Sequence, residues 1–245
     1  MKITILLQFI LISFTAFSQK NTTHQQLLWY AYYNTLQFGD KWFLTTEIQE
    51  RHFIAPLAQH QFLLRSHLHY NLGKAWDVAL GMCLFLQNPH NPLENNQLTV
   101  PELRPHWALA RREKYRWGTL LQRYKIEARF FHNVVQGELV DGYTFANFRL
   151  RYQLGADIPI WKNKNITTNT ISLKISNEIM LNVGENILYN VFDQNRIYLA
   201  VNYAFNDYLQ IEGGYLNWYQ QQKNGKDFYD RDIIRFIIFH KIKLY

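Results

Sequence analysis

The feature that most constrains this chain is an alternation of apolar and polar residues, repeated along many segments separated by turn residues. In the segment 42–52, for example, Trp42 and Ile48 share one face, whereas Glu47 and Arg51 share the other. Successive side chains of a β-strand point to opposite faces, so this pattern predicts strands with one apolar and one polar face. We identify eleven such segments and interpret them as strands, at 27–37, 42–52, 61–70, 76–86, 101–110, 118–130, 144–154, 170–182, 194–203, 208–219 and 231–245.

The polar faces of these segments carry full charges rather than only hydroxyl groups. By parity, one face holds Glu47, Arg51, Arg65, Glu102, Arg104, Arg123, Glu127, Arg129, Arg149, Arg151, Glu178, Arg196, Glu212 and Arg235. An arginine facing lipid at the centre of a bilayer costs about 2–4 kcal/mol, so in a membrane barrel such a face has to point into the lumen. We therefore predict that these side chains form a charge network that interlocks across neighbouring strands inside a narrow lumen.

The first eighteen residues have the features of a secretory signal peptide. Lys2 precedes an apolar run at 3–12, and Ala16 and Ser18 match a cleavage pattern, which predicts a mature chain from residue 19. The run is shorter than the ~20 residues that a spanning helix needs, and no later apolar segment reaches that length. We expect residues 1–18 to be the signal peptide and residues 19–245 to form one barrel, the other structure that satisfies every backbone group in lipid.

Aromatic residues and connection lengths also favour a membrane barrel over a soluble secreted β-protein, the rival interpretation. Many aromatic side chains lie near segment ends, as in an interfacial girdle: Trp29, Trp42, Tyr70, Trp76, Tyr143, Tyr203, Tyr208 and Tyr219. Short turns near residues 39, 72, 113 and 206 alternate with longer loops at 53–60, 87–100, 131–143, 183–193 and 220–230. The long stretch 159–169 breaks this alternation.

These observations predict an all-β fold, a closed antiparallel transmembrane β-barrel in the outer membrane of a Gram-negative-type cell. Single-chain bacterial barrels have even strand numbers, so we expect 10 or 12 strands rather than eleven. The expected partners are outer-membrane lipids and, during biogenesis, the barrel-assembly machinery. The formal net charge of +7 suits anionic lipid head groups better than nucleic acid, because a secreted chain leaves the compartment of nucleic acid.

The order of several short motifs resembles an uncharacterised outer-membrane family, the domain of unknown function 2490. The matching motifs are Lys41-Trp42-x-Leu44-x-x-Glu47-x-Gln49-x-Arg51, Arg65-x-x-Leu68-x-Tyr70, Pro101-Glu102-Leu103-Arg104-Pro105, Tyr124-x-x-Glu127-x-Arg129-Phe130, Phe148-Arg149-x-Arg151-Tyr152, Asn177-Glu178, Asp193-x-Asn195-Arg196-x-Tyr198 and Gly214-Tyr215. The resemblance spans most of the chain after residue 18. It implies an outer-membrane barrel and no particular activity.

Three function classes follow from this interpretation. The first is a structural or binding barrel whose lumen is filled by salt-bridged charges. The second is a small channel that prefers anions, because arginine outnumbers glutamate on the inward face. The third is an outer-membrane lipid-modifying hydrolase. The ligand, if the barrel binds one, is not specified by the sequence.

Catalytic and metal-binding groups are sparse. The serines after residue 18 are Ser66, Ser172 and Ser176, and none can be placed beside a histidine base, so we predict no enzyme. His67 and His69 share the inward face, where His106 can approach them, but without a carboxylate at a defined spacing we expect lumen packing and no metal. The single cysteine, Cys83, lies on a small inward face and is expected to be inert. No cofactor is expected.

Overall fold

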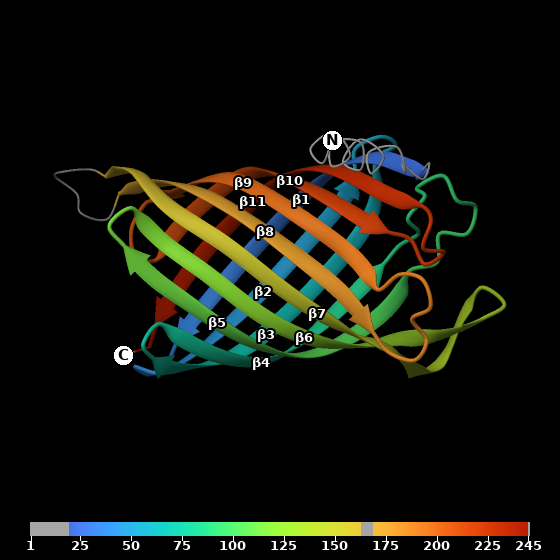
Figure 1. Ribbon diagram of the computed structural model, residues 1–245, viewed down its shortest axis with the longest axis horizontal. Helices are drawn as coiled ribbons and strands as arrows, with labels where there is room; N and C mark the ends of the chain where they lie inside the picture. Colours follow the sequence, from blue (N-terminus) through green and yellow to red (C-terminus); the bar gives the residue numbers. More distant parts are fainter. Residues whose placement is uncertain (1–19, 163–168, 245) are drawn as a thin grey trace, which may run out of the picture.

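The protein is described by a computed structural model, which covers residues 20–162 and 169–244. The predicted signal peptide at 1–18 lies outside these residues. In the described part, no helix is long and apolar enough to cross a membrane. The chain forms strands joined by turns and loops, and these strands close into one barrel (Figure 1).

The barrel contains eleven strands within the described residues. They are β1 (Thr22–Gln37), β2 (Trp42–Phe53), β3 (Ala58–Gly73), β4 (Trp76–Gln87), β5 (Val100–Tyr115), β6 (Gly118–Val135), β7 (Glu138–Lys162), β8 (Thr170–Val183), β9 (Phe192–Ala204), β10 (Leu209–Gln221) and β11 (Phe228–Lys243). Nine of them contain one of the predicted segments in full, and β10 and β11 overlap the segments 208–219 and 231–245. The predicted all-β class and closed barrel are therefore confirmed.

The expected count of ten or twelve strands is wrong. Consecutive strands pair antiparallel all around the barrel, and β1 then closes it by pairing in parallel with β11. An odd number of up-and-down strands requires one such parallel junction, because the first and last strands run in the same direction. Thr22 lies opposite Phe228 and Gln37 opposite Lys243, so the two strands match over their full length. The eleven segments of the alternating pattern match the observed number of strands, whereas the general preference of bacterial barrels for even strand numbers does not.

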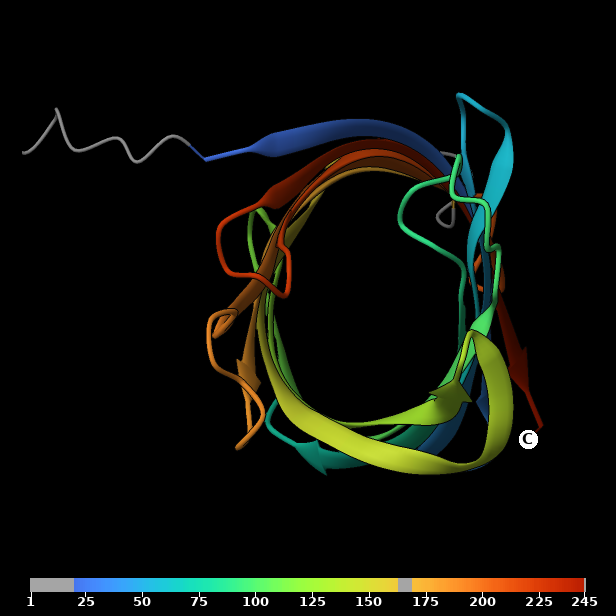
Figure 2. The ribbon, with the colours of Figure 1, turned by 90° about the vertical axis from the view of Figure 1, so that its right-hand side faces the viewer.

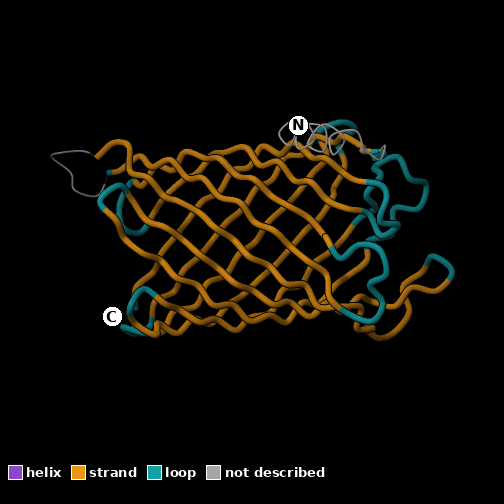
Figure 3. The backbone as a smooth tube through the Cα atoms, in the orientation of Figure 1, coloured by secondary structure: helices purple, strands orange, loops and turns teal. Residues whose placement is uncertain are grey.

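The two rims of the barrel differ, as Figures 1 and 2 show. At the rim where β11 ends, the described connections are 38–41, 74–75, 116–117 and 205–208. At the opposite rim the connections are 54–57, 88–99, 136–137, 184–191 and 222–227. We call these the turn rim and the loop rim. The strands cross the barrel wall obliquely between them (Figure 3), the tilt that barrel closure requires.

The strands extend into several stretches that were predicted as loops. The stretch 131–143 is a hairpin extension of β6 and β7 beyond the rim, closed by Gln136 and Gly137 (Figure 1). Both residues have positive φ, 53° and 84°, the conformation of a two-residue turn that follows the twist of its strands. Likewise β7 continues through Pro159 to Lys162, so no twelfth strand forms there in the described residues. The stretch 53–60 leaves only the connection 54–57.

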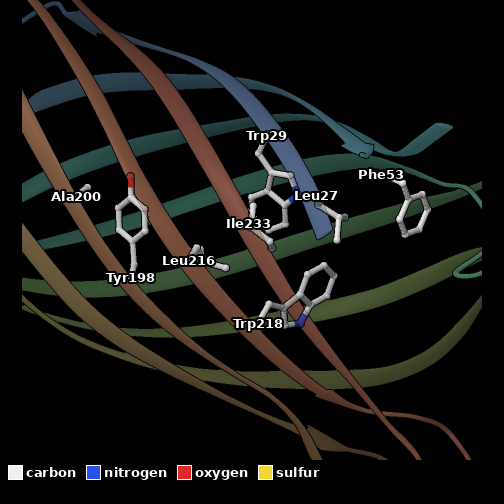
Figure 4. Packing of buried hydrophobic residues seen from close by; sticks show 8 residues of the cluster. All are labelled: Leu27, Trp29, Phe53, Tyr198, Ala200, Leu216, Trp218 and Ile233. Carbon is white, nitrogen blue, oxygen red and sulfur yellow. The ribbon is translucent and has the colours of Figure 1, made fainter. Parts of the chain in front are cut away.

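The two faces of the barrel wall have opposite chemistry. Along β9, Ile197, Leu199 and Val201 point outward and are about half exposed, whereas Tyr198 and Ala200 are buried inside. An apolar cluster on the inner wall lies toward the loop rim and consists of Leu27, Trp29, Phe53, Tyr198, Ala200, Leu216, Trp218 and Ile233 (Figure 4). The remaining inner wall is mainly polar.

Candidate functional site

The candidate functional site is the interior of the barrel, where the charges that the sequence assigns to one face lie. Each of the fourteen predicted residues lies on a strand, with its side chain on the inner side of the wall. Nine of them are buried: Glu47, Arg51, Glu102, Arg104, Glu127, Arg149, Arg151, Glu178 and Glu212. The other five are partly buried: Arg65, Arg123, Arg129, Arg196 and Arg235. The alternation places them inside because each strand turns its apolar side outward.

The densest part of the network joins β6, β7 and β8. Arg151 donates to Glu127 and to Glu178, each at 2.8 Å. Arg123 also donates to Glu178 at 2.8 Å, and the Lys125 ammonium lies 3.1 Å from Glu127. One arginine thus links two carboxylates, and each carboxylate holds a second cation. Because these groups are buried, removal of a single member leaves an uncompensated charge, which costs about 3–5 kcal/mol.

A second group of ion pairs lies closer to the loop rim. Glu102 accepts from Arg104 and from Arg129, each at 2.6 Å. Arg149 lies 2.8 Å from Asp193, a residue at the start of β9. The first contacts join β5 to its neighbour β6, and the last joins β7 to β9, which is separated from it by β8 alone.

The opposite part of the inner wall has ion pairs with tyrosine partners. Arg65 contacts Glu47 at 3.1 Å, and the Tyr33 hydroxyl donates to the same carboxylate at 2.8 Å. Glu212 is held by the Lys174 ammonium and by the Tyr198 hydroxyl, each at 2.7 Å. The carboxylates of this region therefore each have both a cation and a phenol as partners.

A cavity of about 470 Å³ lies between these groups. Eight cationic side chains line it: Arg51, Arg65, Arg112, Arg123, Arg151, Lys174, Arg196 and Arg235. Four carboxylates line it as well: Glu47, Asp157, Glu178 and Glu212. The cavity is therefore an electropositive chamber inside the barrel, of the volume that small-molecule sites commonly have.

Trp29, Trp218 and Arg231 on the inner wall were not predicted from the sequence, and of these only Trp29 lines the chamber. Trp29, assigned to an interfacial girdle, is instead inside the barrel and only 1% exposed. Trp218 and Arg231 are also buried inside, with 2% and 0% exposed. Parity is the signal that finds them, because Trp29 shares the face of Leu27, and Arg231 shares the face of Arg235. None of the other predicted girdle residues is buried.

The inward histidines come together as expected. The rings of His67 and His106 are 4.5 Å apart, and those of His67 and His69 are 5.6 Å apart. Thr45 lies 3.1 Å from His69 Nε2, and Asp77 lies 2.9 Å from its Nδ1. No group of three or more histidine, cysteine or acidic residues suited to a metal occurs in the described residues.

The serines remain apart from the histidines. Ser66 pairs in register with Thr46 on β2, whereas His52 pairs with Gln59 near the loop rim. Ser176 accepts a hydrogen bond from Gln153 at 3.4 Å. No hydrogen bond joins a serine to a histidine in the part of the chain that the structure describes, so the described residues contain no serine activated by a histidine. Cys83 is fully buried beside Leu63 and Phe85.

The fold and the site together define a class: a closed β-barrel with an apolar outer wall and a charged, partly hollow interior. Within that class, the chain belongs to the family described as Protein of unknown function (DUF2490), whose model matches residues 26–229. The match covers β1 to the beginning of β11 and confirms the resemblance. No curated protein and no solved structure matches the chain.

Proposed function

We propose that this protein is an outer-membrane β-barrel whose lumen is closed by its own charge network and serves as a binding chamber. The observation that carries the proposal is the inverted distribution of side chains. Leu80 is 64% exposed on the outer wall of β4, while Glu127 and Arg231 are 0% exposed on the inner wall. A water-soluble barrel places its apolar face inside, whereas a barrel in lipid places it outside.

Aromatic residues at the turn rim support the same proposal. The exposed aromatics beside the short connections include Phe38, Trp42, Tyr115, Trp117 and Tyr208. Tyrosine and tryptophan collect at the head-group level of membranes, because each ring has an apolar body and a polar edge. We infer that this ring marks one membrane interface, that outer-membrane lipids surround the wall, and that the barrel-assembly machinery inserts it.

Membrane fractionation together with heat-modifiability on a denaturing gel tests the location and the fold. We expect the protein in the outer-membrane fraction, with different migration before and after boiling, because closed barrels resist detergent until heated. Release in soluble form without a migration shift would contradict the proposal, and the alternating faces would then belong to a periplasmic or secreted β-protein.

A small anion-preferring channel is the second candidate, favoured by the eight cations against four carboxylates around the cavity. The two candidates differ in planar-bilayer recordings. A lumen closed by ion pairs gives no stable conductance steps. A channel gives steps whose anion preference falls when Arg151 is replaced by glutamine. Steps of that kind would replace the binding-chamber proposal with the channel.

A further inference from the structure

Four arginines inside the barrel have no carboxylate within salt-bridge distance in the described residues: Arg51, Arg196, Arg231 and Arg235. Their hydrogen-bond partners are neutral. Arg51 donates to the amide oxygens of two glutamines, Gln49 and Gln61. Arg196 likewise donates to Gln194, Arg231 to Gln25 and Gln220, and Arg235 to the Tyr33 hydroxyl. These neutral groups solvate a guanidinium without balancing its charge.

Three of these arginines stack with two tryptophans in an alternating series. The guanidinium carbon of Arg51 lies 3.8 Å from the ring centroid of Trp29, and that of Arg196 lies 5.6 Å from the same ring. Arg196 also lies 4.6 Å from the ring of Trp218, which Arg231 approaches to 4.4 Å. The two indole rings meet edge to face at 5.7 Å. These cation–π contacts hold the guanidinium groups against the rings without bringing a carboxylate into contact with them.

Donor groups without acceptors remain at the same place. The indole Nε1 atoms of Trp29 and Trp218 and the Nε atoms of Arg196 and Arg235 are buried and have no hydrogen-bond partner. Trp29, Arg51, Arg196 and Arg235 all line the 470 Å³ cavity, and the two tryptophans project inward from β1 and β10 (Figure 4). Buried hydrogen-bond donors normally have acceptors, so these unpaired donors indicate a ligand that accepts hydrogen bonds and carries negative charge.

The loop rim closes over one end of the site. His90, in the connection 88–99, lies 3.3 Å from Arg231. Burial and the nearby positive charge of Arg231 lower the pKa of His90 to about 3, so the ring is neutral at physiological pH. The neutral His90 ring can therefore accept a hydrogen bond from Arg231 without adding positive charge to the site.

We propose that Arg51, Arg196, Arg231 and Arg235, with Trp29 and Trp218, form a binding site for a small soluble molecule bearing phosphate with at least two negative charges. The planar guanidinium fork matches phosphate oxygens in pairs, and a phosphate in the cavity can accept from Arg51, Arg196 and Arg235, which line it. Trp218 and Arg231 extend the stack beyond the cavity lining. The cavity has room for a group larger than a single inorganic ion. This inference rests on the proposed binding barrel and names its ligand class.

Calorimetric titration of the full-length, detergent-folded protein with inorganic pyrophosphate tests the site, at constant ionic strength set with chloride. We expect saturable binding to wild type. Arg51→Gln and Arg196→Gln each weaken binding at least tenfold, because each removes a charge-assisted donor. Arg111→Gln is the control, since Arg111 is paired with Glu113 and does not line the cavity. Its affinity stays within about threefold of wild type, a change smaller than one lost charged hydrogen bond.

Folding of each variant is checked by the heat-modifiability shift, so loss of binding with an intact shift is attributed to the site. A heat-modifiable wild-type barrel that does not bind pyrophosphate overturns the ligand site and leaves the barrel proposal standing. Equal weakening by Arg51→Gln and Arg111→Gln overturns it as well, because the loss of affinity then reflects the general positive charge of the protein. Citrate binding without pyrophosphate binding overturns the assignment to phosphate.

A competition experiment distinguishes a soluble phosphate compound from the phosphate head group of a lipid. The barrel wall separates the cavity from surrounding lipid, so short-chain phosphatidic acid in micelles should not displace pyrophosphate. Displacement would overturn the assignment to a soluble molecule and identify a lipid head group that enters through a rim.

Discussion

At the scale of single residues, the interior depends on charges that balance one another without water. Arg151 is the centre of this balance because it contacts both Glu127 and Glu178, and it is 8% exposed. Buried ion pairs add little net stability compared with apolar packing, but breaking one is costly. The stability of the barrel is therefore sensitive to loss of one partner rather than to the number of pairs.

We expect Arg151→Gln to lower the free energy of unfolding by about 3–5 kcal/mol, because two buried carboxylates lose their shared partner. Arg111→Gln is the control. Arg111 pairs with Glu113 but its side chain is 38% exposed, so its loss should cost at most ~1 kcal/mol. Urea titration of the detergent-folded protein measures both. Equal effects of the two substitutions would mean that the buried network is not a stability determinant.

At the scale of the strand, each element separates two environments by parity alone. On β4, Leu80 and Met82 point outward and are 64% and 48% exposed, while Ala79 and Cys83 are buried inside. The small inward residues have a steric reason. A Cβ added to Gly81 would clash with the backbone oxygen of Ser66 and lie 2.5 Å from His106 Nε2, so this position on β4 accommodates only a glycine beside His106.

A charge placed on the outer face of a strand should be costly only if that face contacts lipid. We expect Leu80→Arg to lower the stability of the barrel folded into vesicles by about 2–4 kcal/mol. The same change at Leu57, 82% exposed in the connection 54–57, should cost about 0–1 kcal/mol. Equal, small effects at both positions would indicate an outer wall in water.

At the scale of the whole molecule, the parallel junction between β1 and β11 closes the barrel and places the beginning of β1 at the loop rim and the end of β11 at the turn rim. This junction is as extensive as the antiparallel ones, with Thr22–Gln37 paired throughout. The barrel therefore has no unpaired edge in the described residues, which removes a template for aggregation.

Paired cysteines test the closure. Leu28 lies opposite Ile234 in the parallel register, and both point outward. We expect Leu28→Cys combined with Ile234→Cys to form a disulfide under mild oxidation, because opposed residues of paired strands have Cα atoms within bonding range. Leu28→Cys combined with Ile238→Cys is the control, displaced by four residues along β11, and it should not cross-link. A reversed result would place β1 in a different register.

The amino-acid sequence by itself determined the strands, their two faces and the charged side of each. The alternation along each strand was sufficient to assign the fourteen charged residues to one face, because successive side chains of a strand alternate whatever its neighbouring strands are. Trp29 lies near the end of its segment, which predicts an interfacial position, whereas its parity with Leu27 agrees with its burial inside the barrel. Trp218 lies in a segment with a less regular pattern.

Only the tertiary structure decided the number of strands, the partners of each charge and the existence of the chamber. Closure with an odd strand number depends on whether the last strand reaches the first, which no local pattern encodes. Arg151 finds Glu127 on a neighbouring strand, but the stack of Arg51, Trp29, Arg196 and Trp218 joins residues from β1, β2, β9 and β10. Such contacts depend on barrel radius and strand tilt, and these are properties of the closed sheet rather than of any one segment.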